Sequence, residues 1–258
     1  MERMSLSYDG PVAVLKFNHP EVLNAVGGQM LEDFADALLE LARSDARALL
    51  LTGEGRGFSA GANLQDEGRS ERKGGAGSGL RTHYHPILLG LRDLNMPIVT
   101  AVNGPAAGVG MSFAMMGDLV CASKKAFFLQ AFTKIGLVPD GGSTFMLPRL
   151  VGWGRAVEMS MLAERLSAEE AAEWGLVNRL YDDNDALAEG SLALATRLAN
   201  GPKSIALTRQ LYWATWQNSF EQQLHMESVL QDEAGASSDS REGIASFLEK
   251  RDPIFTGK

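Results

Sequence analysis

The sequence predicts an α/β fold that passes into a helical C-terminal region. Four short β-rich runs recur in the first half of the chain, and patterns typical of helices separate them. These runs are VAVLKF (12–17), ALLLTG (48–53), PIVTAVNG (97–104) and DLVCAS (118–123). Strand-like runs end near residue 180, and the apolar residues beyond that point recur at helical spacing. With 258 residues, 45% of them hydrophobic, the chain can bury a substantial core.

Two helices of this core are predicted from local signals. Across residues 30–42 the apolar side chains keep the i, i+3, i+4 spacing of one buried face, so this segment should pack against the sheet. Ser167 and Glu170 have the spacing of a capping box, which predicts a short helix through Trp174. Gly175 would end that helix.

The last part of the chain is predicted to be helical throughout. One helical pattern covers residues 203–232, and a second helix begins at about Ser240. The many large apolar side chains here exceed what a small body is expected to cover, and such helices often form an interface between subunits. We therefore divide the chain into a core, residues 1–199, and a helical oligomerisation region, residues 200–258.

Composition limits the partners and the compartment. The formal net charge of −8 gives no electrostatic footprint for nucleic acid. A single cysteine, Cys121, excludes an intramolecular disulfide and a cysteine-based metal cluster, and fits a reducing compartment. No apolar run approaches the ~20 residues of a membrane span, and the start MERMSLSYDG lacks the apolar core of a signal peptide. We expect a cytoplasmic protein with no membrane partner and no bound metal.

The stretch GFSAGANL (57–64) contains a G-x-S-x-G, the signature of a serine nucleophile. A nucleophile elbow needs a strand that leads almost directly into the serine, whereas a glycine-spaced loop separates Leu51 from Ser59. Only His225, inside the C-terminal helical pattern, follows in the order that such a triad requires. These observations disfavour a serine hydrolase.

Backbone amides offer an alternative role for the same stretch. Small residues let a ligand approach the main chain, and a helix that started near Ala62 would leave its first N–H groups unpaired. A second strand-to-helix turn follows at residues 103–110, NGPAAGVG. Two such turns can form an oxyanion hole. Close packing of a helix on a strand would explain the small residues equally well.

Residues 66–82, DEGRSERKGGAGSGLRT, are polar and glycine-rich, which predicts a mobile surface loop. The loop follows GFSAGANL directly, so it either covers a site there or is an inert insertion. His83, Tyr84 and His85 come next and either line an acyl pocket or lie in solvent.

Taken together, the ordered motifs resemble the enoyl-CoA hydratase/isomerase (crotonase) superfamily. The matching segments are HPEVLNA (19–25), GRGFSAGANL, NGPAAGVGMSFAMMGDLVCAS, KIGLVPDGGSTFMLPRLVGWGRA, LSAEEAAEWGLVNRL and REGIASFLEKRDPIF. The resemblance implies a spiral of ββα units with a C-terminal trimerisation region, a trimer or hexamer, and an acyl-CoA substrate without any further cofactor. It places the thioester oxygen between the amides of Ala62 and Val109. The substrate contacts that it implies are Ala25, Ser59, Ala60, Gly61, Leu64, Gly108, Gly110, Phe132, Phe247 and Lys250.

Within the family, three positions favour an isomerase. Hydratases carry two glutamates where this chain has Ser112 and Phe132, so both carboxyl groups of hydration are missing. Asp140 stands where related isomerases, including those acting on 3-enoyl-CoA and on epoxide-CoA esters of phenylacetate degradation, keep an acidic proton shuttle. The sequence around Asp140 resembles the phenylacetate branch most. A hydratase of fatty-acid or aromatic-acid degradation and a non-catalytic acyl-CoA binder remain the alternatives.

Two further expectations concern the surroundings of this site. An apolar wall of Phe132, Leu137 and Val138 would strengthen Asp140 as a base by desolvation, although P-D-G-G alone is also a common turn. By the resemblance, Lys250 lies where the tail approaches the CoA phosphates of a neighbouring subunit. A solvated basic helix end is the alternative for this residue.

Overall fold

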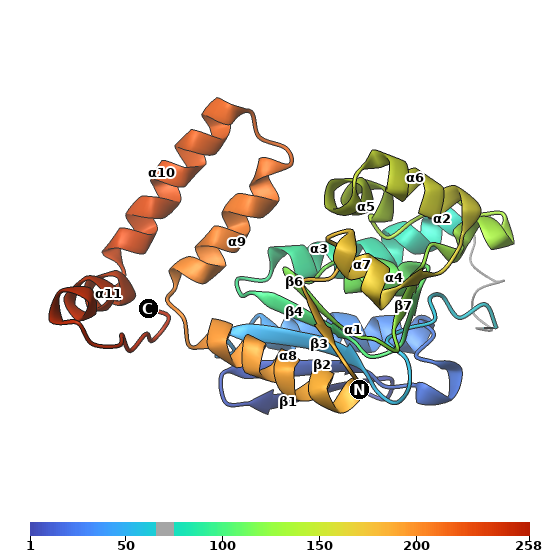
Figure 1. Ribbon diagram of the computed structural model, residues 1–258, viewed down its shortest axis with the longest axis horizontal. Helices are drawn as coiled ribbons and strands as arrows, with labels where there is room; N and C mark the ends of the chain where they lie inside the picture. Colours follow the sequence, from blue (N-terminus) through green and yellow to red (C-terminus); the bar gives the residue numbers. More distant parts are fainter. Residues whose placement is uncertain (66–74) are drawn as a thin grey trace.

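A six-stranded sheet forms the centre of the molecule in the computed structural model, which describes residues 1–65 and 75–258 (Figure 1). The strands are, in spatial order, β1 (Met4–Asp9), β2 (Val12–Phe17), β3 (Ala48–Gly53), β4 (Ile98–Val102), β6 (Leu119–Ser123) and β9 (Arg179–Tyr181). β1 pairs antiparallel with β2, and all other neighbours are parallel. The four strands predicted from the sequence are confirmed as β2, β3, β4 and β6.

Helices bury both faces of this sheet. The helices are α1 (Gly28–Leu41) and α3 (His85–Asp93) on one face and α8 (Asn184–Ala199) on the other. Leu49 and Leu51 of β3 pack in the cluster that includes α1 and α3. The alternate residues Ala48 and Leu50 pack against α8. Strands buried on both sides have continuous apolar runs, which explains why ALLLTG could be recognised as a strand from the sequence. The helix predicted at residues 30–42 is confirmed as α1.

A second layer carries the turns and short helices that follow β4. Its elements are β5 (Pro105–Ala107), β7 (Phe127–Leu129), β8 (Leu166–Ser167), α4 (Val109–Ala114), η4 (Ala131–Ile135), α5 (Ser143–Val151), α6 (Trp153–Leu162) and α7 (Ala168–Glu173), and the three strands form one small sheet. The capping box is confirmed: the Ser167 hydroxyl accepts a hydrogen bond from the Glu170 amide, and the Glu170 carboxylate accepts one from the Ser167 amide. Gly175, with φ +84°, follows α7 as predicted.

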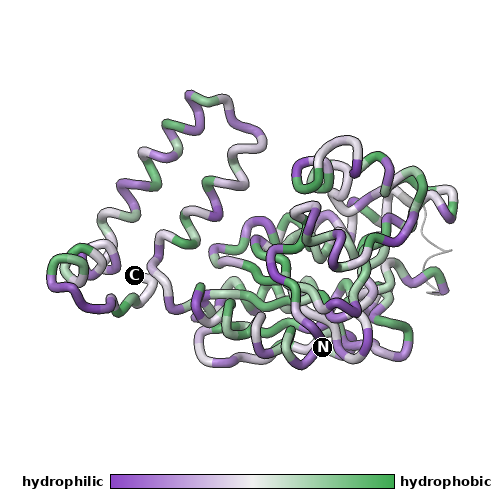
Figure 2. Tube along the Cα trace, viewed as in Figure 1, coloured by the Kyte–Doolittle hydropathy of each residue, from purple (hydrophilic) through white to green (hydrophobic). Residues whose placement is uncertain are grey.

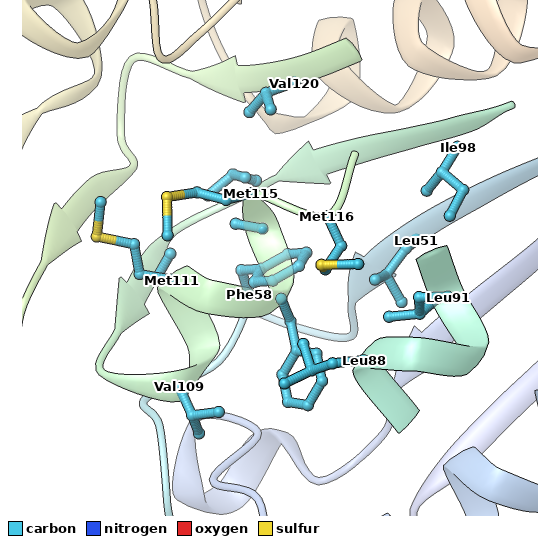
Figure 3. Packing of buried hydrophobic residues seen from close by; sticks show 14 of the residues in the cluster. Leu51, Phe58, Leu88, Leu91, Ile98, Val109, Met111, Met115, Met116 and Val120 are labelled. Atoms are coloured by element: carbon cyan, nitrogen blue, oxygen red, sulfur yellow. The ribbon is translucent and has the colours of Figure 1, made fainter. Parts of the chain in front are cut away.

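An aromatic cluster anchors the first glycine-rich segment in the core. Ring centroids of Phe17, Phe34, Phe58 and Phe113 lie 5.3 to 5.7 Å from one another in the contacting pairs. Figure 3 shows Phe58 among the core side chains of the sheet, α3 and α4. Because Phe58 directly precedes Ser59, this packing fixes the start of the segment that reaches the site. Cys121 is also buried, which raises the pKa of its thiol to about 11, and it therefore behaves as a small core residue.

The C-terminal helices extend away from the body (Figure 1). They are α9 (Ser204–Thr215), α10 (Phe220–Ala236) and α11 (Ser238–Glu249). The prediction of one helical segment over residues 203–232 was wrong, because the chain turns at 216–219. Ser219 then starts α10 with its own capping box to Gln222. Apolar periodicity continues across this turn, so it did not reveal the break. α11 begins two residues before Ser240.

Hydrophobic residues recur along these helices (Figure 2), and several of them are exposed in the single chain. The most exposed large side chains are Tyr212, Phe220, Ile244, Phe247 and Leu248. Within residues 1–65 and 75–258, no helix has the length and apolar character needed to cross a membrane.

One buried arginine fastens α9 to the body. Arg209, only 6% exposed, donates from Nε to Asp118 at 2.7 Å. Its Nη atoms donate to the carbonyl oxygens of Leu91 and Leu94, at the end of α3. Trp216 at the end of α9 packs edge-on against Phe145 of α5, with the ring centroids 5.3 Å apart. The helical hairpin is therefore attached to the core along α9.

Candidate functional site

A cavity of about 780 Å³ opens where the two glycine-rich turns meet the segment around Asp140. Its wall includes parts of residues 60–64, 75–85, 108–109 and 131–142. Apart from His85, Tyr84, Asn63 and Asp140, the described side chains of this wall are apolar or absent. Main-chain groups therefore supply much of the polar surface.

The first turn presents the amide of Ala62. Val26 pairs with this segment, since its N–H donates to Gly61 O at 2.7 Å and its carbonyl accepts from Asn63 N at 2.9 Å. Gly61 has φ +93°, and a Cβ here would lie 2.6 Å from Ala107 O, so only glycine fits. Ala62 lines the cavity, and its N–H donates to no group within residues 1–65 and 75–258. The helix considered near Ala62 is absent from residues 62–65. Its free amide comes from the turn at Gly61 instead.

The second turn presents the amide of Val109. Gly108 has φ +52°, donates its N–H to Leu129 O at 2.8 Å, and leads directly into α4. Val109 is the first residue of α4, so its N–H has no acceptor within the helix. In the described part of the chain this N–H donates to no other group. The predicted strand-to-helix turn is therefore confirmed.

The two turns are joined by hydrogen bonds. Ser59 N donates to Pro105 O at 2.9 Å, and Ala107 N donates to Ser59 O at 3.0 Å. Gly110 lies against Ser59 so closely that a Cβ on it would stand 2.4 Å from the Ser59 carbonyl oxygen. The two turns that carry the Ala62 and Val109 amides are therefore held side by side, and both residues line the same cavity.

Asp140 lies on the wall of this cavity next to the start of α4. Its own carbonyl oxygen accepts hydrogen bonds from the hydroxyls of Ser112 at 3.0 Å and Ser143 at 2.8 Å. At the next residue, Gly141 with φ +62°, a Cβ would lie 3.2 Å from Val109 Cγ2. Among the described lining residues Asp140 is the only carboxylate, and the residue is partly exposed.

All three residues of the apolar wall predicted near Asp140 line the cavity. Phe132 is 6% exposed, and its ring lies over Gly108, since a Cβ there would be 3.8 Å from Phe132 Cζ. Leu137 and Val138 also line the cavity, although the Val138 side chain is 80% exposed.

The predicted contact residues fall into two groups. Those that line the cavity are Ala60, Gly61, Leu64, Gly108 and Phe132. Ala25, Ser59 and Gly110 do not line it. Ser59 is fully buried and donates its hydroxyl to Asn24 O at 2.8 Å, a geometry that argues against a nucleophile. Phe247 and Lys250 lie exposed in and just after α11, at the far end of the molecule from α2, and line no part of this cavity in the single chain (Figure 1).

Part of the predicted loop is helical. Residues 66–74 lie outside the described part, but α2 (Ala76–Gly79) and the π-helical turn η3 (Leu80–Tyr84) lead without a break into α3. The wider turn accommodates Pro86, which lacks an N–H and would clash in a regular helix. The glycine-rich composition concealed this helix. Tyr84 and His85 line the cavity, whereas His83 lies 2.7 Å from Thr82 Oγ1 outside it.

Two buried asparagines hold the loop that precedes Ser59. Asn24 Nδ2 donates to the carbonyl oxygens of Glu54 and Gly57 at 3.0 and 2.8 Å. Asn103 Nδ2 donates to those of Gly53 and Gly55, each at 2.9 Å. Neither was predicted to have a role, although both stand in the motifs HPEVLNA and NGPAAG. In the described part of the chain, no group of three acidic, histidine or cysteine side chains is arranged to hold a metal ion.

Comparison with known proteins places this geometry in a family. The model of the enoyl-CoA hydratase/isomerase family matches residues 8–258. A protein of Rhodobacter capsulatus named probable enoyl-CoA hydratase is 42% identical over 254 residues, which are 96% of this chain and 95% of the relative. The 1,2-epoxyphenylacetyl-CoA isomerase of Escherichia coli is 42% identical over 252 residues, with the same two coverages.

A solved structure agrees with the fold. The enoyl-CoA hydratase from Polaromonas sp. JS666 superposes with a TM-score of 0.90 at 32% identity, covering 98% of this chain and 99% of its own. Because the match spans both the body and the C-terminal helices, the fold is that of the crotonase superfamily. The chain belongs to the enoyl-CoA hydratase/isomerase family, near its epoxide-CoA isomerase branch.

Proposed function

We propose that this protein is an acyl-CoA isomerase that moves a double bond of a 3-enoyl-CoA thioester to the 2-position, or performs the related epoxide-CoA isomerisation. The observation that carries the proposal is that Asp140 is the only carboxylate among the described lining residues. Phe132 and Ser112 stand where a hydratase would have its two glutamates, and neither carries a carboxyl group; Phe132 lines the cavity, and Ser112 is buried. A single carboxyl group suits a proton shuttle better than the addition of water.

The reaction then proceeds in two proton transfers. The Asp140 carboxylate removes a proton from C2 of the acyl group, and the electron pair passes into the thioester carbonyl to form an enolate. The amides of Ala62 and Val109 donate to the enolate oxygen, each worth about 3–4 kcal/mol in the transition state. The protonated Asp140 returns its proton at C4, which leaves the double bond between C2 and C3. No atom is gained or lost.

The apolar wall supports this sequence of steps. Phe132 and Leu137 exclude water from one side of the acyl chain, so the enolate is protonated by the enzyme rather than by solvent. CoA enters as part of the substrate and no further cofactor is needed.

A hydratase is the second candidate, because a relative named probable enoyl-CoA hydratase is as similar as the named isomerase. The purified protein should be assayed with 3-hexenoyl-CoA and with crotonyl-CoA. Isomerisation of the first without hydration of the second supports the proposal, whereas efficient hydration alone refutes it.

The matched variant is Asp140→Asn, which keeps the size of the side chain and removes the base. We expect its kcat for isomerisation to fall by about 10²- to 10⁴-fold, the usual contribution of a positioned acid–base group. Full turnover of every tested thioester by this variant would instead favour a non-catalytic role for Asp140.

We also propose that α9–α11 assemble this cytoplasmic chain into a trimer or a dimer of trimers. The exposed Tyr212, Phe247 and Leu248 support an interface in this region. Lys250, which lies far from the cavity of its own chain, would then approach the CoA of a neighbouring subunit. A monomeric mass in solution at micromolar concentration would exclude this assembly.

A further inference from the structure

We propose that Ser59 is a positioning residue that fixes the Ala62 amide relative to the Val109 amide, an inference that rests on the oxyanion hole of the proposed function. Ser59 itself does not line the cavity. It lies behind the two turns and is fully buried.

The side chain of Ser59 shapes the first turn. Its hydroxyl donates to Asn24 O at 2.8 Å and accepts from the Gly61 N–H at 3.3 Å. The second bond spans two residues, as in a serine turn, and ends on the residue that immediately precedes Ala62. It therefore restrains the left-handed Gly61, whose conformation aims the Ala62 N–H into the cavity.

The main chain of Ser59 holds the second turn. Ala107 N donates to Ser59 O at 3.0 Å, and Ser59 N donates to Pro105 O at 2.9 Å. At Gly110, a Cβ would stand 2.8 Å from Ser59 Cβ and 2.9 Å from its Oγ. The first turn of α4, which carries the Val109 amide, thus rests directly on the Ser59 side chain.

Ser59 can transmit a fixed geometry because its own surroundings are rigid. Phe58 is packed in the aromatic cluster on one side. Asn24, whose carbonyl oxygen accepts the hydrogen bond from the hydroxyl, is fully buried. Its Oδ1 accepts from His19 N, and its Nδ2 donates to Glu54 O and Gly57 O. A shared support of both donor turns is what an oxyanion hole needs, since donors must be held close to their productive geometry.

The test is a comparison of two ligands that differ in one oxygen. A saturated acyl-CoA thioester has the carbonyl oxygen that the two amides bind, and the corresponding thioether lacks it. Calorimetry gives the ratio of their dissociation constants, which measures the contribution of the oxyanion hole without any turnover.

We expect wild-type protein to bind the thioester more tightly and Ser59→Ala to reduce this ratio about fivefold, the value of one net hydrogen bond. The affinity for the thioether should stay within about twofold of wild type. The matched control is Ser191→Ala in α8, where a fully buried hydroxyl donates to Ala188 O far from the turns. This control should leave the ratio unchanged. If Ser59→Ala fails to fold, Ser59→Cys replaces the hydroxyl by a slightly larger and weaker donor and should lower the ratio about twofold.

An unchanged ratio in the folded Ser59 variants overturns the proposal, as does an equal loss of affinity for both ligands. A wild-type protein that binds the two ligands equally overturns it too. The outcome is separable from that of the proposed function. A ratio that depends on Ser59 in a protein without isomerase activity refutes the reaction and retains the inference. Normal isomerisation with a ratio independent of Ser59 refutes the inference and retains the reaction.

Discussion

The N–H of Val109 can be removed by a single substitution. Val109 is the first residue of α4, the position at which a helix tolerates proline best, because no intrahelical bond uses that N–H. The preceding Gly108 has φ +52° and ψ −127°, the mirror image of the extended conformation that a residue before proline prefers, and glycine adopts it freely. Val109→Pro therefore deletes one donor with little change in volume.

The size of the effect follows from the role of the amide. Loss of one oxyanion donor costs about 2.7–4 kcal/mol of transition-state stabilisation, or 10²- to 10³-fold in kcat. Loss of the valine side chain alone should cost activity only through core packing, which includes its contact near Gly141, and Val109→Ala isolates this contribution because it keeps the N–H.

The assay follows formation of the conjugated 2-enoyl thioester from 3-hexenoyl-CoA by its ultraviolet absorbance. We expect Val109→Pro to lose at least about 100-fold in kcat relative to Val109→Ala, with similar circular dichroism for both variants. If a folded Val109→Pro protein stays within about threefold of Val109→Ala, the Val109 amide does not stabilise the transition state.

Two further predictions concern the attachment of the C-terminal helices. Arg209→Ala should lower the free energy of unfolding by about 3 kcal/mol, near the lower end for breaking a buried ion pair, because the Asp118 side chain is 25% exposed. A loss below about 1 kcal/mol in urea titrations would contradict a buried anchor. Burial by itself would raise the pKa of Asp239, but hydrogen bonds from the backbone of Thr256, Lys203 and Gly257 outweigh it and leave that pKa below its usual value. The stabilisation is therefore present above the pKa of the unfolded carboxyl and is lost as the pH falls through the lowered folded value. Thermal unfolding of wild type and Asp239→Asn should differ at pH 7 and converge below about pH 4, whereas a constant difference across this range would exclude the carboxylate as the cause.

The main sheet was predictable from sequence because its strands are buried on both faces. β3 carries four consecutive buried residues, Ala48 to Leu51, and no solvent-facing position interrupts the run. β5, β7 and β8 have three residues or fewer, too short for any period to appear. β1 was missed because most of its residues are partly or fully exposed at the edge of the sheet.

Site residues that a sequence motif singles out could be predicted, whereas the orientation of a side chain in the folded protein could not. Asp140 was identified from its place in the motif KIGLVPDGGST, and the structure places it on the cavity wall. The hydrogen bond from the Ser59 hydroxyl to a buried carbonyl was not predicted. The sequence motif G-x-S-x-G is the same whether its hydroxyl faces a cavity or a buried carbonyl. Only the position of Asn24, distant in sequence, decides between the two.

The architecture explains how relatives with different named reactions can share one framework. β3 and β4 are parallel neighbours, so the turns that follow them emerge at the same edge of the sheet and can exchange the hydrogen bonds of Ser59. The oxygen-binding groups of the proposed function belong to the main chain, so they would survive almost any change of side chain that the turns tolerate. The reaction is then set by which side chains of the cavity wall reach the acyl group. In this chain that wall supplies one carboxyl at residue 140 and an aromatic ring at residue 132, so exchanging these two positions should change the chemistry while the cradle for the oxygen stays in place.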